Sequence, residues 1–197
     1  LQFEGFEHYD LEEYARQIRK RVRKWTGMPV SIGLGPSKAL AKVANRVAKK
    51  FADRTGGIYV IDSEEKRIKA LKWLAIGDVW GIGHRHNKRL VLRQVRTAFD
   101  FTQLSDAWVR KEMSVVGLRL KHDLLGKSSI PLEMIAAPKK AIATTRSFES
   151  LIDDYQELRE RVSTFANLCA EKLRQQNSRC HALVVFARSN PFMPDLP

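Results

Sequence analysis

Two glycines that flank one aliphatic residue form the motif with the clearest chemistry in this sequence. The segment 78–83 reads Asp-Val-Trp-Gly-Ile-Gly, and the basic run 84–90 follows it directly. Gly81 and Gly83 can adopt positive φ and admit a close backbone, while Ile82 is expected to anchor the turn in the core. The next helix would begin with unpaired N–H groups and a partial positive charge, which favour an anion. This pattern predicts a hairpin that binds phosphate.

Arg85, Lys88 and Arg89 would add mobile cations on that helix. A plainer interpretation is a glycine-rich loop between two helices with a solvated basic face, because Gly-x-Gly alone is a weak signal. We favour phosphate binding, since the charge, the glycine spacing and the following helix agree.

The composition points to the same class of partner. The chain has 197 residues, 44% of them hydrophobic, which allows one large domain or two to three small ones. Its 35 Lys and Arg against 22 Asp and Glu give a formal net charge of +13, which favours an anionic partner. We find no apolar stretch of transmembrane length, signal peptide or lipidation motif, so nucleic acid is favoured over a membrane. Cys169 and Cys180 match neither a zinc cluster nor a disulfide framework and suit a reducing cytoplasm.

The first 62 residues follow an α-β-α-β order, which suggests a small sheet covered by helices. Asp10 with Glu13 resembles a capping box at the start of the first helix, whose buried face would carry Leu11, Tyr14, Ile18, Val22 and Trp25. The opposite, basic face is interpreted as solvated. Strands are expected at 30–34 and 58–61, and Ser37 would cap the second helix. On that helix Lys38, Lys42, Asn45 and Lys49 form one stripe.

Residues 63–131 indicate an all-helical unit. Helices are expected from about 62, over 97–104 and over 105–113, with the glycine hairpin after the first of them. Residues 115–118, including Val116 and Gly117, suggest a second, less regular hairpin. Paired hairpins would follow consecutive phosphates on one side of a duplex. An ordinary helix-helix loop is an equally good interpretation there, because Gly117 stands alone.

A linker is expected over 132–140, and residues 141–197 then follow a β-α-β pattern. The strands would cover 142–148 and 182–187, and the helix would carry an apolar stripe from Tyr155 to Leu173. Two strands and one helix are marginal alone. The chain starts without Met, at what reads as the tail of a strand, and ends with Pro191, Pro194 and Pro197. We therefore expect a fragment, cut at both ends.

Four blocks together resemble the Y-family translesion DNA polymerases. They cover 33–44, 48–50, 79–83 and 145–148, in order along the chain. The Val-Trp-Gly-Ile-Gly form and the closing segment 189–192 are most similar to the UmuC branch. The resemblance implies an α+β, multi-domain fold: the C-terminal part of a palm over 1–62, a helix-hairpin-helix thumb over 63–131, and the N-terminal half of a little finger over 141–197.

The resemblance also implies roles for single residues. Lys49 falls where the family places a lysine on the triphosphate of the incoming nucleotide, although by itself it would be read as a solvated lysine. Lys38 and Lys42 would approach a DNA duplex from the palm, and Arg146 would approach the template backbone from the little finger. The implied partners are primer-template DNA, the nucleotide, accessory subunits of the SOS response and a sliding clamp, in the cytoplasm.

The metal-binding carboxylates of the family are missing from this sequence. They lie in an Asp-containing strand and a Ser-Ile-Asp-Glu motif, both expected upstream of Leu1, and Glu4 and Glu7 have no partner Asp. Phosphoryl transfer needs two clustered metal ions, so magnesium is implied for the intact parent only. We expect this chain to bind DNA and to be catalytically inactive. The alternatives are a non-enzymatic helix-hairpin-helix adaptor of DNA repair and an RNA-binding module.

Overall fold

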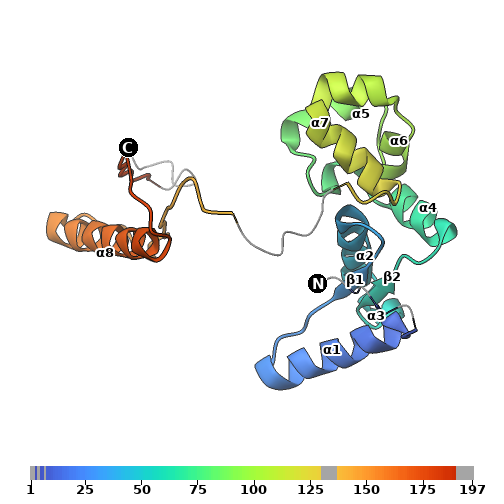
Figure 1. The fold of residues 1–197 in the computed structure, drawn as a ribbon, viewed down its shortest axis with the longest axis horizontal. Coiled ribbons are helices and arrows are strands. Elements are labelled where there is room, and N and C mark those ends of the chain that lie inside the picture. The colour runs from blue at the N-terminus through green and yellow to red at the C-terminus, as the bar shows by residue number, and fades with distance from the viewer. Residues whose placement is uncertain (1–2, 4, 7, 130–136, 190–197) are drawn as a thin grey trace. The chain divides into compact units, whose positions relative to one another are not determined.

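The computed structural model describes residues 3, 5, 6, 8–129 and 137–189 (Figure 1). The chain divides into two compact units, Leu1–Leu132 and Glu133–Pro197. Several sequence interpretations fall outside the described residues: most of the linker, at 130–136, the carboxylates Glu4 and Glu7, and the closing segment 190–197.

The first unit begins with the predicted α-β-α-β order. Its elements are α1 (Leu11–Thr26), β1 (Ile32–Leu34), α2 (Lys38–Lys50), the short α3 (Ala52–Thr55) and β2 (Ile58–Val60). The two strands pair in parallel, with Ile32 opposite Ile58 and Leu34 opposite Val60. Parallel neighbours need a crossover connection, and α2 with α3 provides it. The small helix-covered sheet is confirmed, whereas α3 was not expected.

Helix α2 lies directly on β1 because Gly33 has no side chain. A Cβ atom at Gly33 would lie 1.9 Å from the backbone nitrogen of Asn45. The Asn45 side chain donates a hydrogen bond of 2.6 Å to the carbonyl of Ser31. Asn45 therefore joins α2 to the residue that precedes β1 and does not belong to a free polar stripe. Ser37 caps the helix as predicted, since its hydroxyl accepts from the Leu40 amide.

Helix α1 begins as predicted and buries less than predicted. The Asp10 carboxylate accepts hydrogen bonds from the amides of Glu12 and Glu13 at 2.9 and 3.1 Å. Ala15 is the buried residue of the helix, and Trp25 is 74% exposed. The prediction that the buried face reaches Trp25 was wrong. Each strand is only three residues long, so the 16-residue helix extends beyond the sheet and its C-terminal end has no sheet to pack on. The Arg21 guanidinium lies 5.6 Å from the Trp25 ring.

The remainder of the first unit is helical, as predicted. It contains α4 (Glu64–Trp73), the 3₁₀ helix η1 (Ile76–Asp78), α5 (His84–Leu92), α6 (Ala98–Thr102) and α7 (Asp106–Leu124). Apolar side chains of these elements and of α2 form one continuous core, including Leu40, Leu71, Ile76, Phe101 and Leu124. Residues on both sides of position 62 thus share a single core.

Polar contacts in the interior of the unit join the C-terminal end of α7 to Ser37 and to Arg67 of α4. The Ser37 hydroxyl donates to the Asp123 carbonyl at 2.6 Å, and the Arg67 guanidinium donates to the Leu124 carbonyl at 2.9 Å. The buried Lys121 ammonium contacts the Leu104 carbonyl and the Asp106 carboxylate. Hydrogen bonds from Lys121, which has the largest effect, and from His122 lower the pKa of Asp106. These contacts fix the position of α7 within the unit.

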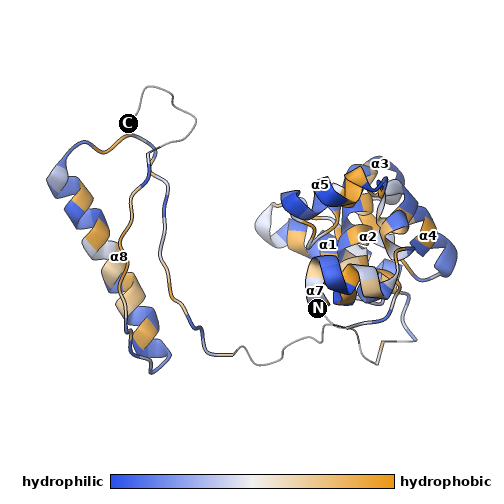
Figure 2. Cartoon of the chain, turned by 90° about the horizontal axis from the view of Figure 1, so that it is seen from above, coloured by the Kyte–Doolittle hydropathy of each residue, from blue (hydrophilic) through white to orange (hydrophobic). Residues whose placement is uncertain are grey.

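The second unit contains α8 (Tyr155–Gln175), capped by Asp154. The strands predicted at 142–148 and 182–187 were wrong, since the described residues of this unit form no strand. Two short strands and one helix bury little apolar surface and are marginally stable alone, which is the physical reason for the missing sheet. Figure 2 shows extended segments with apolar residues beside α8, and Leu183, Val184 and Phe186 are exposed. Phe148 stacks on Phe165 of the helix with ring centroids 6.4 Å apart.

Candidate nucleic-acid interface

The segment between η1 and α5 folds into the predicted tight bend. The Ile82 amide donates to the Val79 carbonyl at 3.0 Å, and Gly81 adopts a φ of 96°, which favours glycine. Ile82 is 7% exposed and belongs to the main core, so it anchors the bend as predicted. Trp80 is 52% exposed beside it. The bend therefore exposes Gly81 and Gly83 on either side of the buried Ile82.

Gly83 plays a different part from the one expected. Its φ is −80°, so positive φ at this position was wrong, and it serves as the N-cap residue of α5. Glycine offers no side-chain oxygen, and no side-chain hydrogen bond caps the helix. The first amides of α5 therefore lack a side-chain cap, which leaves the partial positive charge of the helix end without a side-chain acceptor at Gly83. The element before the bend is the single turn η1 and not an α-helix.

Two cations stand beside this helix start. Arg85 and Lys88 are exposed and have no ion pair or hydrogen bond among the described residues. Arg89 differs, since its guanidinium lies 3.6 Å from the Glu112 carboxylate. Sequence reasoning missed Arg46 of α2, which forms an ion pair of 2.5 Å with Asp78 at the base of the bend. Arg46 and Asp78 are 32 positions apart in the sequence, so no local pattern indicated this contact.

The second predicted hairpin is a break inside α7. Ser114, with φ 63° and ψ −171°, interrupts the helix, and its hydroxyl accepts from the Val116 amide at 3.3 Å. The break is real, but it lies at Ser114 and not at 115–118. Val116 is 67% exposed, whereas Gly117 is buried against Met113. Only Val116 of the pair presents itself to solvent.

The other predicted contacts lie in two places. Lys42 and Lys49 are exposed on α2, and Lys38 is half-buried at its start. Arg146 belongs to the second unit, in the exposed segment before α8. Over the described ranges, no three His, Cys, Asp or Glu side chains gather in a way that suits a metal ion. Among the same residues, no helix is both long and apolar enough to cross a membrane.

The sequence matches two family models. The model of the impB/mucB/samB family matches residues 2–46, and that of the impB/mucB/samB family C-terminal domain matches residues 139–194. The bend at 79–83 lies between these ranges.

Individual relatives match nearly the whole chain. Protein UmuC of Salmonella typhimurium is 35% identical over 188 residues, which are 95% of this chain and 44% of the relative. Protein MucB of Escherichia coli is 32% identical over 92% of this chain and 43% of its own length. DNA polymerase IV of Halobacterium salinarum is 21% identical over 91% of this chain and 42% of its own. The chain thus spans less than half the length of these curated relatives.

Proposed function

This chain belongs to the UmuC-like branch of the Y-family DNA polymerases, and on that premise we propose that it binds primer-template DNA through the phosphate backbone. One observation carries the proposal. The bend at 79–83 sets the uncapped start of α5 beside Arg85 and Lys88, two exposed cations with no partner among the described residues. Amides and cations that converge on one point of the surface suit a phosphate.

The roles of the three segments follow from the family. We propose that residues 1–62 are the C-terminal part of the palm, 63–131 the thumb and 141–197 the start of the little finger, with 132–140 as the linker. Gly81 and Gly83 would offer amides to phosphates, whereas the predicted amide of Ile82 is already bonded to the Val79 carbonyl, so Ile82 would serve the site by anchoring the bend. Lys38 and Lys42 would add charge from α2, and Arg146 would contact the template backbone. At the break in α7, the exposed Val116 would provide the contact, and the buried Gly117 would support it by packing.

The double variant Arg85→Ala/Lys88→Ala tests the interface. It is expected to weaken binding to any primer-template sequence, because the two cations touch phosphates that carry no sequence information. Two lost phosphate contacts lower the slope of log affinity against log salt by about two units. The measurement is a fluorescence anisotropy titration of labelled primed DNA at several salt concentrations.

The matched control is Lys69→Ala/Lys111→Ala, which removes the same charge from exposed positions on α4 and α7. This control is expected to change the slope by less than half as much. An unchanged slope in the hairpin variant, or equal losses in both variants, would contradict the assignment of the bend.

We propose that the intact parent of this chain adds nucleotides opposite damaged template bases, with Lys49 on the triphosphate of the incoming nucleotide. The described residues do not suit a two-metal site, so we assign no catalytic step to them and propose that the chain alone does not polymerise DNA. Lys49 is exposed on the last turn of α2, and a lysine there would act as a point charge on a polyphosphate.

The variant Lys49→Ala tests this role in a longer chain that includes the upstream carboxylates. In primer extension it is expected to raise the nucleotide KM or lower kcat by roughly tenfold, the equivalent of one charge-assisted contact. Lys50→Ala, at the neighbouring exposed lysine, is the control. Identical kinetics for the longer chain with and without Lys49→Ala would refute the triphosphate role of Lys49. Nucleotide addition by the present chain alone would refute the proposal that it is inactive.

A further inference from the structure

A second basic surface lies on the first unit, between α1 and the turn that enters β2. It is a groove of about 540 Å³ in which Gly56 and Ile58 form one side. The other side is made of five cationic side chains of α1: Arg16, Arg19, Lys20, Arg23 and Lys24. None of them belongs to the bend at 79–83. A glycine turn and a row of cations are a combination that suits an anion.

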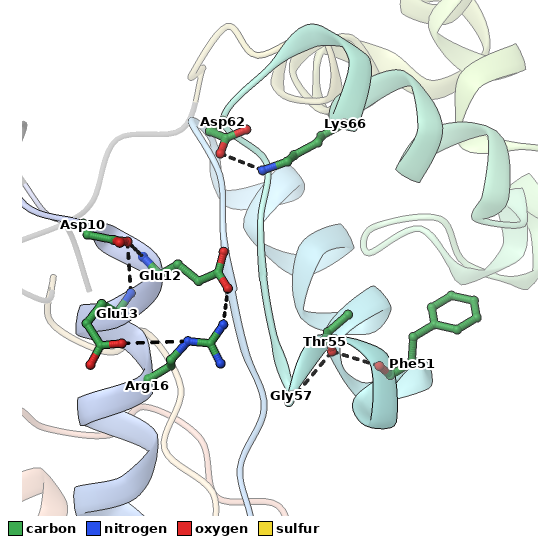
Figure 3. A network of polar contacts seen from close by, with 9 residues as sticks. All are labelled: Asp10, Glu12, Glu13, Arg16, Phe51, Thr55, Gly57, Asp62 and Lys66. Atoms are coloured by element: carbon green, nitrogen blue, oxygen red, sulfur yellow. Dashed lines mark hydrogen bonds and ion pairs between the residues drawn. The ribbon is translucent and has the colours of Figure 1, made fainter.

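The charge in the groove is uneven along α1. Figure 3 shows Arg16 held by the carboxylates of Glu12 and Glu13, so its charge is neutralised locally. Farther along the helix Lys20, Arg23 and Lys24 have no ion pair among the described residues. The part of the groove beside the C-terminal half of α1 therefore carries the uncompensated positive charge.

The turn before β2 is shaped to let guanidinium groups lie on its backbone. Gly56 and Gly57 have φ values of 61° and 77°, which favour glycine. A Cβ atom at Gly57 would lie 2.8 Å from Nε of Arg19, and the same Nε donates to the Val30 carbonyl at 2.8 Å. Arg19 is thereby fixed in place. A cation that is already ordered loses less conformational entropy when it binds a ligand.

We propose that this groove binds one phosphodiester strand of single-stranded nucleic acid, at a site separate from the bend. From Arg19 to Lys24, the cations that Glu12 and Glu13 do not neutralise, the helix rises about 7–8 Å, a length that matches roughly two or three successive phosphates. Arg and Lys suit phosphate oxygens, as a rigid fork and as a point charge. Ile58, the apolar residue among the described groove residues, is 3% exposed, so the groove offers no apolar pocket to anchor a side chain of an acidic peptide. A concave groove also fits one flexible strand better than the convex surface of a duplex.

The triple variant Lys20→Gln/Arg23→Gln/Lys24→Gln tests the proposal by anisotropy with a labelled oligothymidylate. It is expected to lower the slope of log affinity against log salt by about two units, since each phosphate of a single strand contributes roughly 0.7. The control Lys69→Gln/Arg110→Gln/Lys111→Gln removes three charges from exposed positions outside the groove. Circular dichroism establishes that both variants are folded. Equal losses in the two variants, or no loss in the first, overturn the proposal.

A local measurement separates this site from the bend. The amide NMR signals of Gly56 and Gly57 are expected to shift when oligothymidylate is added, both in the parent chain and in Arg85→Ala/Lys88→Ala. Signals that stay in place, or that shift only when Arg85 and Lys88 are present, overturn a separate groove site while leaving the proposed function intact. Polyglutamate is expected to compete poorly, and displacement of the oligonucleotide by polyglutamate at equal charge concentration would assign the groove to acidic protein segments instead.

Discussion

The variant Gly33→Ala is expected to lose the folded state of the first unit. The added Cβ would lie 1.9 Å from the Asn45 nitrogen and 2.5 Å from the Ala44 carbonyl carbon, both atoms of the α2 backbone. A backbone cannot rotate away as the end of a side chain can. The helix would have to move off β1, which would break the hydrogen bond from Asn45 to Ser31 and open the core around Leu40 and Val43. We expect a destabilisation above about 4 kcal/mol, the range of severe core disruption.

Urea denaturation followed by circular dichroism measures this effect, with Gly83→Ala as the control. Gly83 has a φ of −80°, and a Cβ atom there would meet no heavy atom of the described chain within 4 Å beyond its own neighbours, so alanine fits sterically. Its expected cost is below about 1 kcal/mol, from the weaker N-cap preference of alanine. Equal stabilities of Gly33→Ala and the parent chain would contradict the direct packing of α2 on β1.

The features that sequence predicted well depend on neighbours in the chain. Asp10 and Ser37 cap helices because their oxygens reach amides two or three residues ahead. Ile82 is buried because it stands between two glycines in a turn that local residues define. Contacts between residues this close in the sequence can be predicted from the spacing of residue types alone.

The features that sequence did not predict depend on contacts between distant residues. The basic face of α1 was interpreted as solvated, and it becomes one side of a groove only because Gly56 and Ile58 lie opposite. The strand expected at 142–148 has the right alternation and the one expected at 182–187 is continuously apolar, but neither pattern can supply the partners that a sheet needs. The ion pair of Arg46 with Asp78 is likewise a product of tertiary packing.

Gly117→Ala is the second substitution with a large expected effect. At this position helix propensity favours alanine, whereas the packing against Met113 opposes it. Alanine favours a helix interior over glycine by about 1 kcal/mol, so a regular α7 would gain stability. The helix is not regular: the break at Ser114 brings residue 113 so near that the new Cβ would lie 2.4 Å from Cβ of Met113. We expect packing to prevail, with a net loss of roughly 1–3 kcal/mol in urea denaturation.

The companion variant Ser114→Gly separates the two causes. Glycine relieves the strain of a φ of 63°, about 1–3 kcal/mol, and leaves Met113 and Gly117 in place. This gain outweighs the loss of the exposed 3.3 Å hydrogen bond from the Val116 amide to the Ser114 hydroxyl, so the stability of the variant is expected to equal or exceed that of the unmodified chain. If Gly117→Ala were the more stable protein, by about the 1 kcal/mol of helix propensity, the break would not be fixed by packing. The exposed Val116 would then have no rigid position from which to meet a phosphate, and the α7 break would drop out of the proposed interface. A less stable Gly117→Ala means that the buried glycine maintains the break on which the proposed contact of Val116 depends.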